Sequence, residues 1–300
     1  MSTLEESFRF CENLAKKHYE NFPVGSFLVP KEKRKYVWAI YAFARTADDF
    51  ADEGRFKGET LDVLRKRLDQ LDEWEDLLEK CVSGRCDHPI FVALSETISK
   101  LALPPQLLKD LLTAYRMDVE KNRYKNFEEV LYYCKHSANP VGRLVLHIFG
   151  YQEQALHQLS DHICTALQLT NFWQDIAIDF KKDRIYLPQD QMQRFGVSEE
   201  DLKKENPNES FKKLLHFCAQ KTAQLFNQGL PLTELVGKDL KIEMKLTWLG
   251  GTTILRKIKE KDYNVFEFRP EITWRDKFSL LARSFFLKTI RPLEFLNHEL

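Results

Sequence analysis

Apolar residues recur along this chain with the spacing of helices, and the strict alternation typical of strands is scarce. Breaks between the periodic segments coincide with proline or glycine, as at Pro23 and Gly25. In the first half the pattern predicts helices over Ser2–Tyr19, Lys31–Glu53, Thr60–Val82, Pro89–Leu101, Pro104–Asn122 and Phe127–Gly150. We expect a kink at Asn139–Pro140 inside the last of these, and Gly54 is a candidate cap after Glu53.

The second half continues in the same way. Gln152–Phe180 carries the longest helical pattern, and a loop over Lys181–Pro188 and a polar stretch with two weak helical turns follow it up to Ser210. Further helices are expected over Phe211–Gln228, Gly237–Lys261 and Thr273–Lys288. Because no repeat and no Gly/Ser linker divides the chain, the sequence predicts one all-α domain over residues 1–300.

Composition narrows the class of protein. Lysine plus arginine equals aspartate plus glutamate, 45 each, so no overall basic field favours nucleic acid as a partner. The six cysteines form no CxxC pair, which indicates reduced thiols. No secretory signal is evident, and no apolar run approaches the roughly 18 to 20 residues that span a bilayer. We therefore expect a soluble, cytoplasmic protein that at most contacts a membrane surface, with no obvious basic amphipathic anchor.

Four acidic residues lie close together within an otherwise apolar helical pattern. Asp48 and Asp52 are one turn apart, about 6 Å along one face, and Asp49 and Glu53 form the adjacent row. Like charges at this spacing destabilise a helix by a few tenths of a kcal/mol unless a cation binds them. Mg²⁺ prefers such oxygen ligands and keeps water or phosphate oxygens in its shell. A solvated acidic helix end is the alternative.

A second polar row occurs in the longest helical pattern. Asn171, Asp175 and Asp179 lie at i, i+4 and i+8, with a rise of about 12 Å from first to last. Their neighbours, among them Phe172 and Trp173, are apolar, and a buried carboxylate without a counter-charge is costly. This context favours ion binding over a helix with incidental polar positions.

Together the two acidic helices predict a cluster of Mg²⁺ ions held against a diphosphate, since the metal can act as a Lewis acid for that leaving group. Arginine recognises phosphate through two parallel hydrogen bonds, so Arg45 and Arg184 are candidate diphosphate ligands. Tyr186 follows Arg184 in the same loop. His18, just before the break at Pro23 and Gly25, is a further candidate for binding the diphosphate.

On these residues the chain resembles the squalene/phytoene synthase family over nearly its whole length. The residues that look like the family's first aspartate motif are Tyr41, Arg45, Asp48, Asp49 and Asp52. Those that look like its second are Gln168, Asn171, Asp175 and Asp179, followed by Arg184-Ile185-Tyr186-Leu187-Pro188. The resemblance implies an isoprenoid-synthase-type helical bundle around a central cavity.

Four stretches resemble the bacterial branch that converts presqualene diphosphate to hydroxysqualene in hopanoid biosynthesis: Glu20–Ser26, Tyr41–Asp49, Ser137–His147 and Asn171–Asp175. The chain also departs from the wider family. Gln174 stands where many members have arginine, which removes one cation that would contact diphosphate. Lys135, His136 and Asn139 stand where many relatives have small residues, and polar groups there could position water beside a carbocation.

The resemblance implies the following roles. The residues that hold Mg²⁺ are Asp48, Asp49, Asp52, Asn171, Asp175 and Asp179. Those that bind the substrate are His18, Arg45, Tyr133, Gln168, Arg184 and Tyr186. The aromatic faces of Phe22, Tyr41, Tyr133 or Trp173 stabilise a carbocation, and Asn139 positions water. No NADPH is expected, because the product is an alcohol and no GxGxxG fingerprint is present, although relatives that use NADPH lack that fingerprint too. The substrate would be presqualene diphosphate or another prenyl diphosphate, received from other enzymes of the squalene pathway.

Two alternatives stay open. One is the condensation of two farnesyl or geranylgeranyl diphosphates to presqualene diphosphate, squalene, dehydrosqualene or phytoene. The other is a non-catalytic helical interaction protein, which the intact acidic motifs disfavour.

Overall fold

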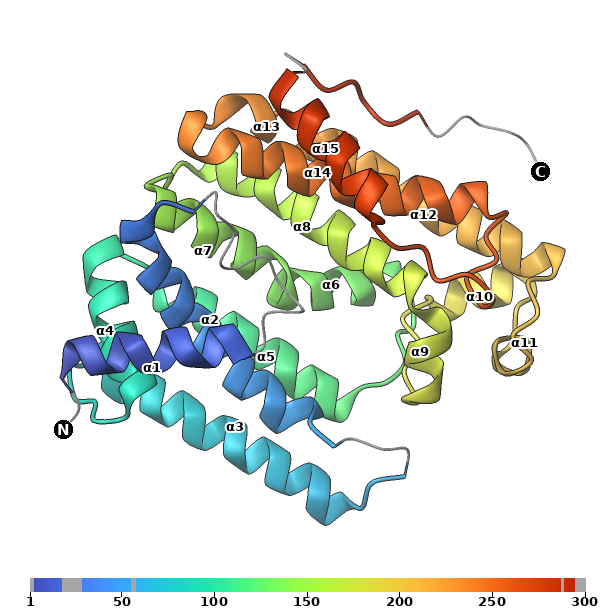
Figure 1. Ribbon diagram of the computed structural model, residues 1–300. Coiled ribbons are helices and arrows are strands. Elements are labelled where there is room, and N and C mark those ends of the chain that lie inside the picture. The colour runs from blue at the N-terminus through green and yellow to red at the C-terminus, as the bar shows by residue number, and fades with distance from the viewer. Residues whose placement is uncertain (1–2, 18–28, 55–57, 287–288, 295–300) are drawn as a thin grey trace. The chain divides into compact units, whose positions relative to one another are not determined.

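The computed structural model describes residues 3–17, 29–54, 58–286 and 289–294, and its regular elements are helices (Figure 1). They are α1 (Leu4–Lys17), α2 (Lys31–Asp52), α3 (Leu61–Val82), α4 (Pro89–Leu101), α5 (Pro105–Glu120), α6 (Phe127–Ser137), α7 (Asn139–Phe149), α8 (Gln154–Gln174), α9 (Ile176–Lys181), α10 (Gln189–Phe195), α11 (Glu199–Lys203), α12 (Glu209–Gly229), α13 (Leu232–Leu235), α14 (Lys238–Glu260) and α15 (Trp274–Phe286). The all-α prediction is confirmed.

The chain divides into two compact units. Unit 1 comprises residues 1–120 and 140–153, and unit 2 comprises residues 121–139 and 154–300. Each unit carries one of the two acidic segments. The prediction of a single domain stays a prediction.

Unit 1 is built around α2, which packs on α1, α3, α4 and α5. Small residues on its buried face, among them Ala39, Ala42 and Ala47, let the neighbouring helices approach closely. Phe43, next to this row, meets Trp74 of α3 and Phe91 of α4 in a cluster of rings, and the Trp74 indole donates a hydrogen bond of 3.3 Å to the Phe43 carbonyl. This packing fixes the helix whose last two turns carry the first acidic segment.

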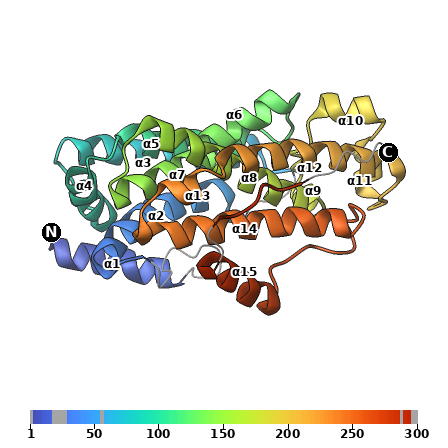
Figure 2. The same ribbon diagram turned by 90° about the horizontal axis from the view of Figure 1, so that it is seen from above.

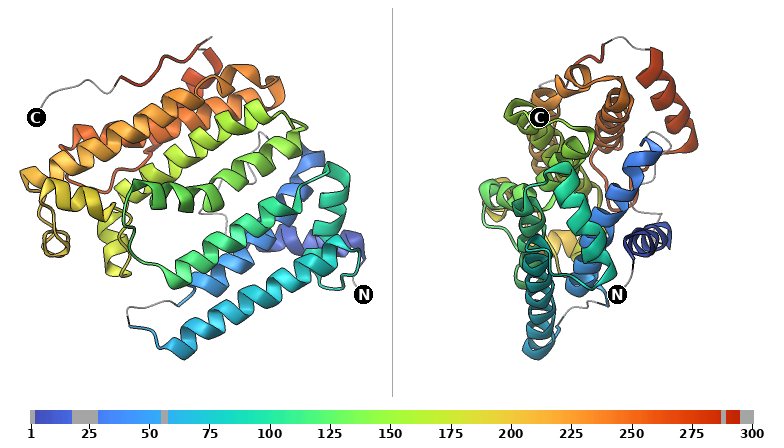
Figure 3. Two further views of the ribbon diagram at one scale, coloured as in Figure 1. Left: turned by 180° about the vertical axis from the view of Figure 1, so that it is seen from behind. Right: turned by 90° about the vertical axis from the view of Figure 1, so that its left-hand side faces the viewer.

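Unit 2 is organised by α8 and α12, which lie side by side (Figure 3). Trp173 of α8 is fully buried, and its indole donates a hydrogen bond of 2.8 Å to Thr222 of α12. Trp173 is therefore a core residue, and its role beside a carbocation stays a prediction. The two helices lie close together at Gly229, where a Cβ atom would lie 2.8 Å from the carbonyl oxygen of Leu159.

Substituting Gly229 with alanine is expected to destabilise the protein by about 1–3 kcal/mol, because backbone and a buried side chain would both have to move. Gly250, in the middle of α14, is the matched control, since a Cβ atom there meets nothing within 4 Å. Alanine at Gly250 should instead stabilise α14 by about 0.5–1 kcal/mol. Urea unfolding midpoints of the two variants test this pair, and equal midpoints would contradict the close contact.

The helix boundaries agree with the pattern in most places. The kink at Asn139–Pro140 is a complete break between α6 and α7, and Gly54 adopts the left-handed conformation (φ 67°) that a cap needs. One prediction is wrong: Gln152–Phe180 is not one helix, since α8 ends at Gln174 and α9 begins at Ile176. Asp175 lies between them with φ −105° and ψ 15°, away from helical values.

Candidate functional site

The first acidic segment forms the last two turns of α2. Arg45 lies one turn before the acids and bridges two of them, at 3.3 Å from Asp48 and 2.5 Å from Asp49. An internal cation thus supplies part of the counter-charge that this spacing requires. Asp52 is the last residue of α2 and is half-buried. The sequence correctly placed Arg45 beside these carboxylates, and the structure adds that Asp48 and Asp49 both pair with its guanidinium group.

Unit 1 contains a cavity of about 320 Å³ beside this segment. The residues that line it are mostly apolar and come from α2, α5 and α7: Val37, Ile40, Tyr41, Ala44, Arg45, Asp48, Leu111, Tyr115, Val141, Leu144, Val145 and Ile148. Arg45 and Asp48 are its charged members. A cavity that combines an apolar wall with a charged pair suits a molecule with an apolar body and an anionic end.

Two polar residues of α5 accompany this site and were missed by the sequence reasoning. Tyr115 lines the cavity, and desolvation raises its phenol pKa well above the usual value, with the Asp48 and Asp118 carboxylates adding to the rise. Desolvation likewise raises the pKa of Tyr41. Both phenols therefore remain neutral hydrogen-bond donors at physiological pH. One feature of the sequence could have identified them: Asp118, a carboxylate, follows Tyr115 by one turn on an otherwise apolar helix face.

The second acidic segment lies in unit 2, where α8 gives way to α9. The Asn171 amide donates a hydrogen bond of 2.8 Å to Asp175, so these two side chains are adjacent, as the spacing predicts. Asp175 also receives both arms of Arg269, at 2.6 and 3.1 Å, and these hydrogen bonds raise the guanidinium pKa. Arg269 lies 94 residues from Asp175, in a segment without a periodic pattern, and no sequence signal identified it.

Asp179, Arg184 and Tyr186 come together in unit 2 beside an aromatic cluster. They line one very small cavity, of about 10 Å³, together with Phe172. Tyr186 stacks on Phe172 at 3.6 Å between ring centroids, and Tyr133 lies against both rings. Arg184, Tyr186 and Tyr133 are all buried. The structure thus brings three predicted substrate-binding residues close to one predicted metal ligand.

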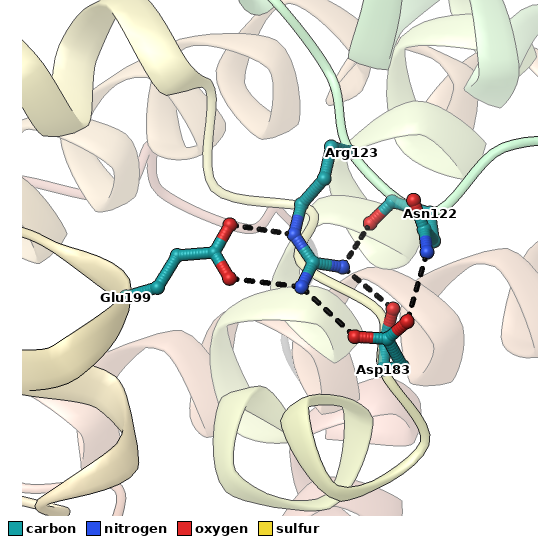
Figure 4. Close-up of polar contacts among 4 residues, drawn as sticks. All are labelled: Asn122, Arg123, Asp183 and Glu199. Carbon is teal, nitrogen blue, oxygen red and sulfur yellow. Dashed lines mark hydrogen bonds and ion pairs between the residues drawn. The ribbon is translucent and has the colours of Figure 1, made fainter. Parts of the chain in front are cut away.

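The loop that carries Arg184 and Tyr186 is held by Arg123 (Figure 4). Arg123 donates two hydrogen bonds to the Glu199 carboxylate, at 2.8 and 2.9 Å. It also donates to the side-chain carboxylate and to the backbone carbonyl oxygen of Asp183. Asp183 has a φ of 62°, a left-handed conformation that is unfavourable for aspartate and needs support from its surroundings. The Ile185 amide donates to the Asn122 carbonyl, next to an isolated parallel bridge between Arg123 and Ile185.

Replacing Arg123 with glutamine is expected to loosen this loop and to destabilise the protein by about 1.5–3 kcal/mol, since a charged donor with several partners is lost. Trypsin should then cleave after Lys182 markedly faster. Arg194 to glutamine, the same change at an exposed position of unit 2, should leave the cleavage rate unchanged. Equal cleavage rates in the two variants would show that Arg123 does not hold the loop.

The remaining predicted residues are distributed as follows. Asn139 is in unit 2, where its side-chain oxygen accepts a hydrogen bond of 2.8 Å from Thr165 of α8. Gln168 lies three residues after Thr165 and three before Asn171, between them around the axis of α8. His136 instead contacts Tyr132, an exposed residue. His18 and Phe22 lie outside the described residues.

The donor atoms of both segments suit magnesium, because carboxylate and amide oxygens are the ligands that this ion prefers. Within the described ranges, no group of three or more His, Cys, Asp or Glu side chains converges tightly enough to hold a metal ion by itself. Mg²⁺ commonly takes only one or two carboxylates and completes its shell with water and substrate phosphates. The carboxylate and amide oxygens present therefore fit Mg²⁺ as ligand atoms.

Comparison with known proteins decides the family. The model of the squalene/phytoene synthase family matches residues 15–276. The chain belongs to this family. It is therefore an enzyme of the squalene/phytoene synthase type, and the resemblance seen in the two aspartate motifs is confirmed.

Individual relatives of this synthase agree. The chain is 37% identical to a hydroxysqualene synthase of Rhodopseudomonas palustris, over 81% of this chain and 80% of that protein. It is 32% identical to a phytoene synthase of Mycobacterium tuberculosis, over 77% and 75%. Among solved structures, squalene synthase HpnC of Alicyclobacillus acidocaldarius matches with a TM-score of 0.80 and 37% identity, over 87% of this chain and 96% of that one.

Proposed function

We propose that this synthase converts presqualene diphosphate and water to hydroxysqualene and releases diphosphate. The observation that carries this proposal is its likeness to two hydroxysqualene synthases, at 37% identity for the protein of Rhodopseudomonas palustris and 36% for that of Sinorhizobium fredii. The chemistry of the two acidic segments and of the unit 1 cavity supports it.

The apolar chain of the substrate would occupy the unit 1 cavity. Its walls are aliphatic and aromatic, and burying prenyl methylene groups there contributes roughly 0.8 kcal/mol for each one removed from water. Arg45 and Asp48 belong to the lining of the same cavity, so a diphosphate attached to that chain would meet them. Tyr41 and Tyr115 line the same cavity, and their neutral phenols could donate hydrogen bonds to the diphosphate.

The proposed Mg²⁺ ligands are Asp48 and Asp52 of unit 1, and Asn171, Asp175 and Asp179 of unit 2. When bound, Mg²⁺ would neutralise the charge that develops on the departing diphosphate. Arg45 and Arg269 pair with these carboxylates in the structure. With Mg²⁺ on these carboxylates, the two guanidinium groups could contact phosphate oxygens. Arg45 would keep its ion pair with Asp49, and Arg269 its ion pair with Glu271.

In the proposed reaction the bond between carbon and the diphosphate oxygen breaks, and the electron pair leaves with diphosphate. The cyclopropylcarbinyl cation rearranges, a water oxygen attacks it, and the attached proton is released to solvent. No electrons are transferred from outside, so the proposal needs no NADPH. Asn139, whose oxygen is bonded to Thr165, has an amide NH₂ that could orient the attacking water.

Gln174 adds support from within the chain. Its side-chain amide donates a hydrogen bond to the Pro270 carbonyl in unit 2. The side chain at this position is therefore neutral and is already hydrogen-bonded to the backbone. A site with one cation fewer than in many family members can neutralise less phosphate charge. It therefore suits one substrate that carries a single diphosphate better than two substrates that each carry a diphosphate.

A second candidate is the condensation of two prenyl diphosphates. It is favoured by the names of other relatives, since HpnC is described as a squalene synthase and the protein of Mycobacterium tuberculosis as a phytoene synthase. Farnesyl diphosphate is the substrate that distinguishes the two reactions, because only condensation would consume it.

Product analysis tests the proposal directly. The purified protein with Mg²⁺ would be given presqualene diphosphate in one reaction and farnesyl diphosphate in another. Hydroxysqualene from presqualene diphosphate, with oxygen from labelled water, is the expected result. Consumption of farnesyl diphosphate would instead assign the condensation reaction. Release of no diphosphate from either would overturn the proposal and leave the condensation of geranylgeranyl diphosphate as the candidate.

A further inference from the structure

Helix α15 exposes a row of large apolar side chains. Trp274, Phe278 and Phe285 have exposed fractions of 66%, 70% and 56%, and Leu281 is 43% exposed. Their spacing of four, three and four residues places all four side chains on one face of the helix. Water-exposed helix faces normally carry polar residues, and a continuous apolar row on the surface indicates a binding face.

The opposite side of α15 is firmly attached to unit 2. Figure 2 shows α15 alongside α14, with which it is in contact. Leu280 and Ser284 are buried, and Asp276 accepts a hydrogen bond from Lys257 of α14. This interaction and those with Thr273 lower the pKa of Asp276 to about 2. The helix thus has its own packed face, and the apolar row is additional to it.

Basic residues accompany the apolar row. Arg275 and Lys277 are exposed and lie about 80° to either side of the row around the helix axis. Arg275 also lies over the Trp274 ring, at 5.3 Å from its centroid. The helix has one acidic residue, Asp276, and its charge is matched by Lys257.

A second pair of cations lies where α15 meets α14. Desolvation and the nearby Arg256 guanidinium together lower the pKa of Arg283. In the part of the chain that the structure covers, neither Arg256 nor Arg283 makes an ion pair with a carboxylate. Arg283 lies about 170° around the helix axis from the apolar row, so this pair borders the face that packs on α14 and not the exposed row.

We propose that α15 docks on the surface of a bilayer that contains anionic phospholipids. Trp274, Phe278, Leu281 and Phe285 would enter the boundary between headgroups and acyl chains, and the flanking cations would contact lipid phosphates. An apolar row with aromatic residues and basic flanks is the pattern of helices that lie in this boundary. No described helix is long and apolar enough to cross a membrane, so docking would be peripheral.

Charge favours a lipid surface over a second copy of the chain. A symmetric dimer through this face would bring the Arg275 and Lys277 flanks of both copies together, and like charges there would oppose association. A bilayer with anionic headgroups offers the complementary charge. The proposal concerns binding alone and holds whichever prenyl reaction the protein catalyses.

Vesicle sedimentation tests the proposal with the full-length protein. Vesicles containing phosphatidylglycerol should bind the protein at least about tenfold more tightly than pure phosphatidylcholine vesicles, and salt should weaken the binding. Substitution of Phe278 and Phe285 with serine should reduce binding at least about tenfold, because two aromatic rings no longer enter the lipid. Both side chains are largely exposed, so folding should be unaffected, which circular dichroism can verify.

Leu61 and Leu235, with exposed fractions of 83% and 60%, provide the matched control. Serine at these two positions removes exposed apolar side chains elsewhere and should leave vesicle binding unchanged. A blue shift of Trp274 fluorescence on vesicles, absent from a Trp274→Phe variant, would locate the contact. Equal loss in both serine variants, or binding indifferent to lipid charge, would overturn the proposal. So would a dimer in sedimentation velocity that Phe278→Ser and Phe285→Ser dissociate, since the occupant would then be a second copy.

Discussion

Replacing Asp48 with asparagine is expected to lower kcat/KM for the prenyl diphosphate by about 10²- to 10³-fold, which is the typical effect of removing one group that stabilises a developing charge. Asparagine keeps the shape of the side chain and one oxygen, but it removes the negative charge that would attract Mg²⁺. Asp48 lines the unit 1 cavity and contacts Arg45, so the change also removes one of two acids that hold this guanidinium.

The measurement is steady-state release of diphosphate over a range of Mg²⁺ concentrations. The variant should need more Mg²⁺ for half-maximal activity, because one charged ligand is missing. Asp76→Asn is the matched control, since Asp76 is an exposed acid on α3 of the same unit. If Asp48→Asn and Asp76→Asn retain equal activity and equal Mg²⁺ dependence, Asp48 is not a metal ligand.

The sequence predicted the geometry of the first acidic segment well because its residues lie on one helix. When Arg45, Asp48 and Asp49 share a continuous α2, their relative positions follow from helix geometry alone. The same reasoning was only partly successful for the second acidic segment. Asn171 and Asp175 are adjacent as expected, but the helix ends at Gln174, so the spacing up to Asp179 crosses a break that the apolar pattern did not reveal.

Residues that act through long-range contacts could not be predicted. Arg269 meets Asp175 across 94 residues, and Arg123 meets Glu199 across 76, so tertiary structure alone brings each pair together. The binding face of α15 was missed for a related reason. The pattern over Thr273–Lys288 indicated a helix, but only the structure shows which of its apolar residues pack against α14 and which are exposed.

Replacing Val145 with tryptophan is expected to reduce turnover of the prenyl diphosphate at least about 100-fold, because each methylene group excluded from an apolar pocket costs about 1–3 kcal/mol of discrimination. Val145 is half-buried on α7 and lines the unit 1 cavity with Val141 and Ile148, which lie on the same helix face. An indole there would fill space that the proposed function assigns to the prenyl chain. Diphosphate release, measured against substrate concentration, gives the size of the loss.

Two comparisons distinguish a blocked cavity from a damaged fold. Val145→Ala enlarges the same cavity and should retain turnover within about tenfold, since one small apolar contact is lost. Inorganic diphosphate with Mg²⁺ should bind the tryptophan variant with unchanged affinity in calorimetry, because its proposed ligands are the charged residues and not the apolar wall. A tryptophan variant that turns over substrate at the original rate would exclude this cavity as the prenyl site. Loss of diphosphate binding as well would show that the substitution disturbs α2, where Arg45 and Asp48 lie beside the same cavity.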